Sequence, residues 1–319
     1  MLKITRGIFQ SSLRTTDSGF VKNYRLGLLL GVGAYLFWGL FPLYWPLLEP
    51  ANSIEIVAHR AVWTFVVCVA ALTYSHKLRS TLALMRIPRI VLRLLLSTCL
   101  ISVNWLVYIW GVNHGHVVEC ALGYYINPLI IIAFGVLLLK EKMRKWQWVS
   151  VGIALIGVII LTVDYGRPPW IALALAASWG SYGLVKKQLG LEALQGLAIE
   201  TFLSLLPYGG YLLWIGNKGT GQFGHHVALT TLLILAGVFT AIPLLMFNSS
   251  ANKLPYIVIG LLQYITPTVQ FLIGVLVRHE VMTTARWIGF FIVWLALLAL
   301  AVDLVKSGST SDDSLAELD

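Results

Sequence analysis

The sequence predicts an all-α membrane protein with ten transmembrane helices, arranged as two inverted repeats of five helices each. Composition is the first observation behind this prediction: of 319 residues, 58% are hydrophobic and 12% are charged. A soluble domain carries about 25% charged residues, twice this fraction. The mean hydropathy of +0.81 points the same way. Such a composition excludes a disordered chain, a nucleic-acid-binding module and a cytosolic enzyme with a polar surface.

Long apolar runs are the second observation. Each run comes close to the about 20 residues that a helix needs to cross a bilayer. Continuous apolar stretches such as 129–139 favour helices over the alternating pattern of β-barrel strands. The predicted spans are 26–46, 54–74, 91–112, 118–139, 145–163, 168–186, 196–215, 228–248, 256–277 and 284–304.

Lysine and arginine residues lie mostly on one side of these spans. Of the 23 basic residues, 18 fall in the tail and loops of one side and four on the other, with Arg60 inside a span. Basic loops stay in the cytoplasm, so we expect a multi-pass protein of the bacterial plasma membrane with both termini cytoplasmic. The first run follows a basic tail and lacks a small-residue cleavage pattern, which predicts a retained span.

An internal repeat is the third observation. Residues 113–164 and 252–303 are identical at 15 of 52 positions without a gap, whereas composition alone predicts roughly five matches. An odd number of spans per copy makes the two copies insert in opposite directions, which is typical of secondary transporters. The alternative is an old duplication in a protein that transports nothing. The matches include Tyr125 and Tyr264, Pro128 and Pro267, Glu141 and Glu280, and Asp164 and Asp303.

The repeat divides the chain into four segments. We expect a basic cytoplasmic tail at 1–25, the first five-helix repeat at 26–165 and the second at 166–305. Residues 306–319 are small, polar and acidic, which predicts a disordered cytoplasmic tail.

His59 and Arg60 lie about a turn and a half into the second span. A charged side chain at membrane depth costs at least about 2.5 kcal/mol, so such residues usually face a cavity or a partner. His59 and Arg60 therefore predict a site for an anionic group, with His59 as a carrier of a coupling proton. The alternative is that Arg60 extends to the outer interface and His59 packs in the core.

Two glutamates mark the other candidate coupling positions. Glu119 begins the fourth span and is expected to pair with Arg60 or His59, or else to lie in water at a helix start. Glu200 lies in the seventh span and is expected to carry a coupling proton, or to be held by Lys186 or Lys187.

Matched prolines predict the position of a central substrate site. Asn127-Pro128 and Thr266-Pro267 are expected to break the fourth and ninth spans, because proline leaves a backbone carbonyl free. The alternative is a pair of structural kinks, with some aromatic residues acting as interface anchors. With His59 and Arg60, the predicted substrate-binding residues are Trp38, Asn104, Trp105, Tyr108, Tyr124, Asn127, Trp179, Gln263, Tyr264 and Thr266.

Other features of the sequence argue against catalysis and metal binding. It contains no GxSxG, HExxH or phosphate-binding glycine loop, so we expect no enzyme and no cofactor. His114 and His116 have no further ligands nearby in the sequence, which predicts no metal site. Glu141 and Glu280 follow the fourth and ninth spans and are expected to act as hinges or caps at the start of the next helix.

Several motifs occur in order along the chain: His59-Arg60, Val103-Asn104-Trp105, Ile109 to Asn113, Glu119, Leu122 to Pro128, Glu200-Thr201 and Gln263 to Thr268. Together they resemble the motifs of RarD-type proteins, in the EamA branch of the drug/metabolite transporter superfamily. The resemblance runs from about Arg25 to Asp303 and implies a ten-helix inner-membrane permease whose relatives export metabolites, amino acids or drugs. Lys140 and His279 stand where the family usually has glycine, so a special turn geometry at these two positions is in question.

Together these features predict a secondary active transporter that moves a small metabolite or drug across the plasma membrane by alternating access. Export is expected because the resemblance implies it, and proton coupling through His59, Glu119 and Glu200 is left open. The expected partners are a small-molecule substrate and the lipid bilayer, with no nucleic acid; a homodimer is left open. The alternative function is a non-transporting membrane sensor or scaffold.

Overall fold

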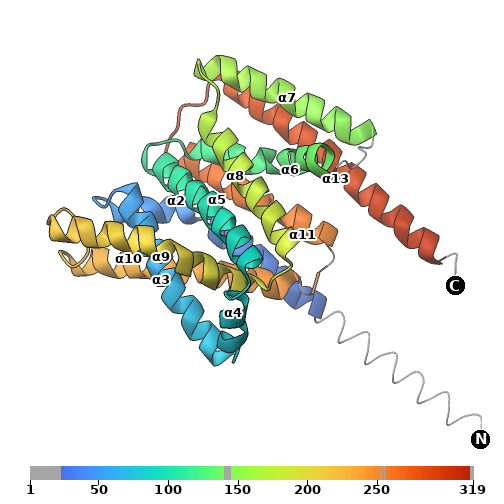
Figure 1. The fold of residues 1–319 in the computed structure, drawn as a ribbon. Coiled ribbons are helices and arrows are strands. Elements are labelled where there is room, and N and C mark those ends of the chain that lie inside the picture. Colours follow the sequence, from blue (N-terminus) through green and yellow to red (C-terminus); the bar gives the residue numbers. More distant parts are fainter. Residues whose placement is uncertain (1–22, 140–144, 252, 255, 317–319) are drawn as a thin grey trace, which may run out of the picture.

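A computed structural model describes residues 23–139, 145–251, 253–254 and 256–316, and every regular element in these ranges is a helix (Figure 1). The first element is the helical segment Asn23–Leu48, which includes α2 (Phe41–Tyr44) and the 3-10 helix η1 (Trp45–Leu48). The others are α3 (Ser53–Tyr74), α4 (Leu78–Leu84), α5 (Pro88–Asn113), α6 (Val117–Leu139), α7 (Lys145–Tyr165), α8 (Trp170–Leu189), α9 (Ala193–Asn217), α10 (Val227–Ala251), α11 (Tyr256–Leu262), α12 (Ile265–Leu272), the π-helical turn η2 (Ile273–Val277) and α13 (Thr284–Ala316).

Local signals in the sequence explain several helix ends. The Asn52 side chain caps α3 by accepting a hydrogen bond of 2.9 Å from the Glu55 backbone N–H. Pro88 occupies the first turn of α5, where its missing N–H costs nothing. Gly190 ends α8 in the left-handed conformation, with φ of 60°.

Among the described residues, seven helices are long and apolar enough to cross a membrane, so the chain is a multi-pass membrane protein. The helical stretches Val117–Ile130 and Ile265–Val277 are apolar but shorter. The sixth predicted span coincides with α8, whose hydropathy is lowered by polar residues such as Ser178, Ser181 and Lys186. The count of ten spans therefore stays a prediction. The seven helices are Asn23–Leu48, Ser53–Tyr74, Pro88–Asn113, Lys145–Tyr165, Ala193–Asn217, Val227–Ala251 and Thr284–Val302.

The two matched prolines have different effects on their helices. Helix α6 continues through Pro128, so the break predicted in the fourth span is absent; one missing backbone bond does not interrupt the helix. The ninth span does break, but before its proline, between the end of α11 and the start of α12. Pro267 lies in the first turn of α12, where backbone N–H groups have no intrahelical acceptor.

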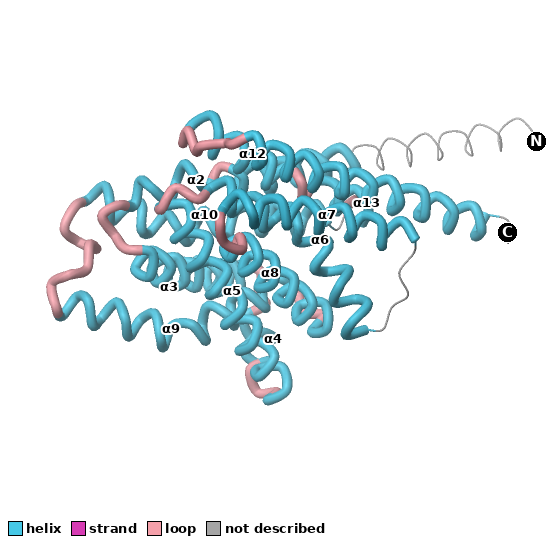
Figure 2. The backbone as a smooth tube through the Cα atoms, turned by 90° about the horizontal axis from the view of Figure 1, so that it is seen from above, coloured by secondary structure: helices cyan, strands magenta, loops and turns pink. Residues whose placement is uncertain are grey.

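The helices pack in two groups, each with its own hydrophobic core. In the first group, α3 packs against α9 and α10, and α5 packs against α8 (Figure 1). In the second group, α7 and α13 lie side by side in both views, and α6 packs against α12 (Figure 2). Helix α6 also packs against α8 and so joins the groups. Trp45, Ile56 and Ile109 are buried in the first core; Leu122 and Phe290 are buried in the second.

Helix α13 extends to Ala316, through part of the segment that the sequence predicts to be disordered. Once a helix is nucleated by packed residues, each further residue adds at little cost, so a polar continuation is compatible with its composition. The predicted N-terminal tail up to residue 22 lies outside the described residues, as do Lys140 and Glu141.

Large apolar side chains cover the outside of the described helices. The exposed fraction is 85% for Leu206, 76% for Val163 and 71% for Leu213. A water-soluble protein rarely exposes apolar surface on this scale, whereas lipid tails cover it without cost. The burial pattern therefore agrees with the composition.

Gly237 marks the closest approach between α10 and α3. A Cβ atom at this position would meet the backbone of Trp63 and the amide nitrogen of Thr64, the latter at 2.5 Å. Gly209 in α9 has no atom within 4 Å of the corresponding position.

Replacing Gly237 by alanine is expected to destabilise the protein by about 1–3 kcal/mol, because the clash forces backbone to move. The matched control, Gly209→Ala, is expected to leave stability unchanged or to raise it by up to about 1 kcal/mol. Thermal unfolding of both purified variants in the same detergent checks this. Equal melting temperatures for the two variants would contradict the close packing.

Candidate functional site

Arg60 is buried among aromatic side chains at the centre of the first helix group. It is 5% exposed, and its guanidinium carbon lies 4.0 Å from the ring centroid of Trp105 and 5.1 Å from that of Trp45. Its Nε donates to the Thr240 hydroxyl of α10 at 2.9 Å. Among the described residues, no carboxylate forms an ion pair with Arg60. A buried cation is thus held by ring faces and one hydroxyl.

A layer of hydrogen-bonded polar side chains continues from Arg60. The Gln270 amide on α12 donates to the Tyr108 hydroxyl at 2.8 Å. The Tyr124 hydroxyl on α6 donates to the Asn104 carbonyl at 3.3 Å. Asn104 in turn donates to Ser178 on α8 at 3.1 Å. We call the set of Arg60, Asn104, Trp105, Tyr108, Tyr124, Thr240 and Gln270 the central cluster; it is built from α3, α5, α6, α10 and α12.

Five of the predicted substrate-binding residues belong to this central cluster: Arg60, Asn104, Trp105, Tyr108 and Tyr124. Two predicted tryptophans border it. The Trp179 ring packs edge-on against Tyr124, with centroids 6.4 Å apart. The backbone carbonyl of Trp38 accepts a 3.4 Å hydrogen bond from Gln270.

The remaining predicted residues near the breaks differ in their contacts. Asn127 is buried on α6, and its Oδ1 has no hydrogen-bond partner among the described residues. The Thr266 hydroxyl donates to the Tyr35 carbonyl at 2.7 Å. Tyr264 packs on the second hydrophobic core, and Gln263 is half-buried beside it.

Sequence reasoning missed Trp45 and Thr240 and left Gln270 out of the predicted site. Thr240 and Gln270 are polar residues within apolar runs, which is the signal that could have found them. Trp45 looks like an interface anchor at the end of the first span, and only the fold reveals that its ring faces Arg60.

His59 points away from Arg60. Its ring stacks on Phe223, with centroids 4.7 Å apart, beside the loop between α9 and α10. Successive helix residues are rotated by about 100°, so neighbours in sequence face different surroundings. The structure therefore does not bring the two predicted residues into one site.

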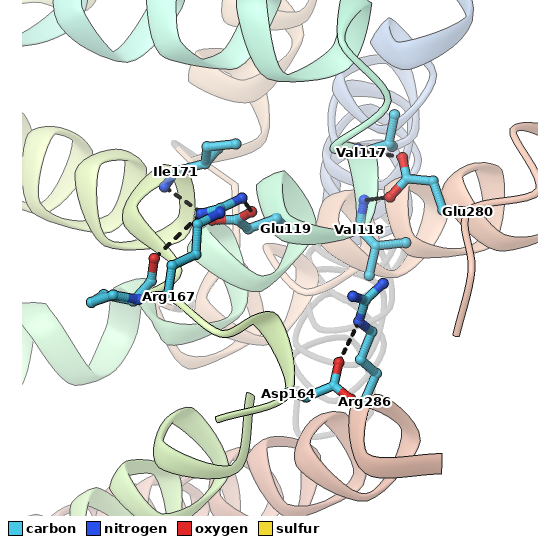
Figure 3. Close-up of polar contacts among 9 residues, drawn as sticks. Val117, Val118, Glu119, Asp164, Arg167, Ile171, Glu280 and Arg286 are labelled. Atoms are coloured by element: carbon cyan, nitrogen blue, oxygen red, sulfur yellow. Dashed lines mark hydrogen bonds and ion pairs between the residues drawn. The ribbon is translucent and has the colours of Figure 1, made fainter. Parts of the chain in front are cut away.

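Glu119 is held at the start of α8. Its carboxylate pairs with Arg167 at 2.9 Å and accepts a 3.1 Å hydrogen bond from the Ile171 backbone N–H (Figure 3). The predicted pairing with Arg60 or His59 is wrong, because Glu119 faces α8 rather than α3. Arg167 is one of the four basic residues predicted on the outer side. Glu119 is therefore paired with a cation, and its side chain is buried rather than exposed to water.

Glu280 caps α6, a helix far earlier in the chain. Its carboxylate accepts hydrogen bonds from the backbone N–H groups of Val117 at 2.5 Å and Val118 at 3.0 Å, at the first turn of α6 (Figure 3). Burial raises the pKa of this carboxyl group, while the two backbone donors oppose that shift. Glu280 is a cap, as predicted, but of α6 instead of the helix that follows it. Nearby, Arg286 of α13 pairs with Asp164 of α7 at 2.7 Å.

His279 holds a conformation that favours glycine. Its φ of 52° lies in the left-handed region, which costs a residue with a Cβ about 1–2 kcal/mol. The turn geometry questioned at this position is therefore kept without the glycine, and it brings Glu280 to α6.

Replacing His279 by glycine is expected to raise the free energy of unfolding by about 1 kcal/mol, because the strain is relieved without loss of the cap. Thermal unfolding measures the gain. His226→Gly serves as the control, since His226 is exposed and has no positive φ. A stabilisation by His226→Gly of the same size would contradict the assigned cause.

Glu200 forms a buried ion pair where α5, α8 and α9 meet. Its carboxylate lies 2.9 Å from the Lys186 ammonium and accepts hydrogen bonds from Ser97 at 2.5 Å and Tyr182 at 3.1 Å. The exposed fractions are 1% for Glu200 and 19% for Lys186. Of the two predicted alternatives, retention by a lysine is therefore observed, through Lys186.

Comparison with known proteins identifies the family. The sequence pattern of the EamA-like transporter family matches residues 25–163. Protein RarD of Streptomyces exfoliatus is 48% identical over 288 residues, covering 90% of this chain and 91% of that protein. The chain belongs to the RarD family of EamA-like transporters.

Other members of the RarD family match over the same length. The uncharacterized transporter YojE of Bacillus subtilis (strain 168) is 43% identical over 286 residues, covering 88% of this chain and 95% of that protein. Protein RarD of Escherichia coli (strain K12) is 37% identical over 286 residues, covering 89% and 96%. A solved structure, described as "Crystal structure of protein", shares the fold with a TM-score of 0.59 at 16% identity, covering 88% of this chain and 98% of that one. The resemblance predicted from the motifs is confirmed.

Proposed function

We propose that this RarD-family protein is a secondary active transporter that moves a small molecule with an anionic group and an apolar body by alternating access. The observation that carries the proposal is Arg60. A buried guanidinium without a carboxylate among the described residues is costly for a fold, and an anionic ligand would offset that cost. The rings of Trp105, Tyr108 and Tyr124 offer stacking surface for the apolar part of such a molecule.

The arrangement of the helices supports two inverted repeats. The 139-residue offset between 113–164 and 252–303 relates α6 to α11 and α12, and α7 to α13. When the repeat is extended towards the N-terminal part of each copy, α3 of the first copy corresponds to α9 of the second. The pairs α3 and α9, α6 and α12, and α7 and α13 are each in contact, which is compatible with a two-fold axis that passes between the halves. Between such halves a central site can open to one face and then to the other.

Glu200 is the carboxylate we propose for proton coupling. Protonation of Glu200 would release Lys186 and loosen the junction of α5, α8 and α9, which borders the central cluster through α5 and α8. Glu119 is held by Arg167 and Ile171, and His59 faces a separate pocket, so neither is assigned a coupling role here. Export as the direction of transport is proposed from the family resemblance.

A ligand screen followed by flux measurements tests this function. Purified protein in nanodiscs is exposed to matched pairs of aromatic carboxylates and their amides, such as phenylacetate and phenylacetamide, and ligands are detected by thermal shift. We expect carboxylates to stabilise the protein more than amides, and the hits to cross proteoliposome membranes with saturable kinetics that a pH gradient accelerates. Hits that bind but never cross would overturn transport and favour the sensor alternative.

A further inference from the structure

A pocket lies outside the central cluster, at the end of α3 that is predicted to face outward. It encloses a cavity of about 210 Å³ between α3, the C-terminal end of α9 and the loop that leads to α10. Its wall includes Glu55, His59, Leu212, Ile215, Phe223 and His225. Glu55 and His59 are one helical turn apart and therefore project to the same side of α3.

Glu55 and His59, which both line this pocket, have buried polar atoms without a hydrogen-bond partner among the described residues. Glu55 is 1% exposed; its Oε1 accepts a 2.6 Å hydrogen bond from the Gln222 backbone N–H. Its Oε2 is buried without a hydrogen-bond partner among the described residues, and so are both ring nitrogens of His59. One carboxylate oxygen therefore anchors the loop, while the other lacks the donor that a buried oxygen requires.

The carboxylate of Glu55 and the ring nitrogens of His59 favour a ligand that is positively charged and donates hydrogen bonds. We infer that this pocket binds a small primary ammonium compound with an apolar body. The ammonium group donates to Glu55 Oε2 and to an unprotonated His59 nitrogen, and the Phe223 ring, which stacks on His59, adds cation–π attraction. Leu212 and Ile215 supply the apolar wall.

Other ligand classes fit the pocket less well. An anion would be repelled by Glu55. No group of three His, Cys, Asp or Glu side chains with metal-binding geometry occurs in the part of the chain that the structure describes. A neutral hydroxyl compound can also donate to Glu55, but it brings no positive charge to neutralise the buried carboxylate.

Calorimetric titration of the full-length protein in nanodiscs with benzylamine tests the inference, with benzyl alcohol as the uncharged counterpart. We expect saturable binding of benzylamine that Glu55→Gln weakens about tenfold or more. This variant keeps an oxygen for the Gln222 N–H, so the loop stays anchored. Phe223→Leu is expected to weaken binding by a smaller factor.

Glu49→Gln is the matched control, because Glu49 is an exposed glutamate near the same end of the molecule and lies outside the pocket. It should bind benzylamine like the wild type. The inference is overturned if benzylamine does not bind, if benzyl alcohol binds as tightly, or if Glu55→Gln and Glu49→Gln have equal effects. The readout is binding at equilibrium, so it does not depend on transport.

Discussion

Replacing Arg60 by methionine is expected to reduce substrate flux about a hundredfold or more, while the protein remains at least as stable as the wild type. Methionine fills similar space, and its sulfur packs well against the rings of Trp105 and Trp45. Thr240 is not left without a partner, because its hydroxyl also donates to the Ala236 carbonyl at 2.8 Å. The substitution removes the desolvation cost of a buried charge, and among the described residues it leaves no carboxylate without its partner, so we expect no loss of stability.

The opposite effects on flux and stability separate two roles for Arg60. If Arg60 only stabilised the fold, Arg60→Met would lower the melting temperature and flux together. If Arg60 binds substrate, the loss of charge-assisted hydrogen bonds costs about 3 kcal/mol in affinity, or roughly a hundredfold. Arg60→Lys is the control: it keeps the charge without the planar fork and is expected to retain partial flux. Undiminished flux in Arg60→Met would reject the proposed site.

Replacing Glu200 by glutamine is expected to destabilise the protein by about 3 kcal/mol, since it leaves the Lys186 ammonium largely buried without its carboxylate. Glu192→Gln is the matched control, because Glu192 pairs with Lys77 at 2.8 Å while both side chains are 45% exposed. That exposed pair is expected to contribute less than about 1 kcal/mol.

The double variant Glu200→Gln with Lys186→Met tests whether the charge of Lys186 causes the loss. It should recover most of the stability, since no unpaired ammonium remains. Thermal unfolding of the wild type, both single variants and the double variant completes the cycle. If the double variant is no more stable than Glu200→Gln, the ion pair is not the cause.

Helices and family could be predicted because their signals are local in the sequence. The helices observed coincide with the predicted apolar runs, and the motif around Tyr124 and Tyr125 is enough to suggest the family. Two predictions about local structure were wrong: the break at Pro128, and disorder from residue 306, where α13 continues to Ala316. A proline in the sequence shows which backbone hydrogen bond cannot form. Whether α6 continues past Pro128 depends on its packing against neighbouring helices such as α8 and α12, which the sequence does not show.

Side-chain partners were harder to predict, because they depend on helix rotation and on segments far along the chain. Arg60 and His59 share a depth in the membrane, yet they face Thr240 and Phe223, on α10 and on the loop before it. Glu119 pairs with Arg167, which lies in the loop between α7 and α8, where the sequence contains none of the motifs used above. Glu55 is a first-turn residue of α3 three positions after the Asn52 cap, and the Phe223 side of its pocket lies about 170 residues further along the chain, so the sequence alone does not indicate this pocket.

Accessibility of the central cluster from each face of the membrane tests alternating access most directly. A single cysteine is introduced by Thr240→Cys after Cys68, Cys99 and Cys120 are replaced by alanine, and a membrane-impermeant thiol reagent is applied to one face at a time. Thr240 lies 2.9 Å from Arg60 and is 6% exposed, so labelling requires the site to open.

A companion protein also carries Asp164→Cys and Arg286→Cys, joined by a bis-maleimide before labelling. These residues pair at the end of α7 and the start of α13, on the side predicted to face outward. Alternating access predicts that the cysteine at 240 reacts from either face in the unbridged protein, and only from the cytoplasmic face in the bridged one. Labelling from a single face in both proteins, or from neither face, would contradict it.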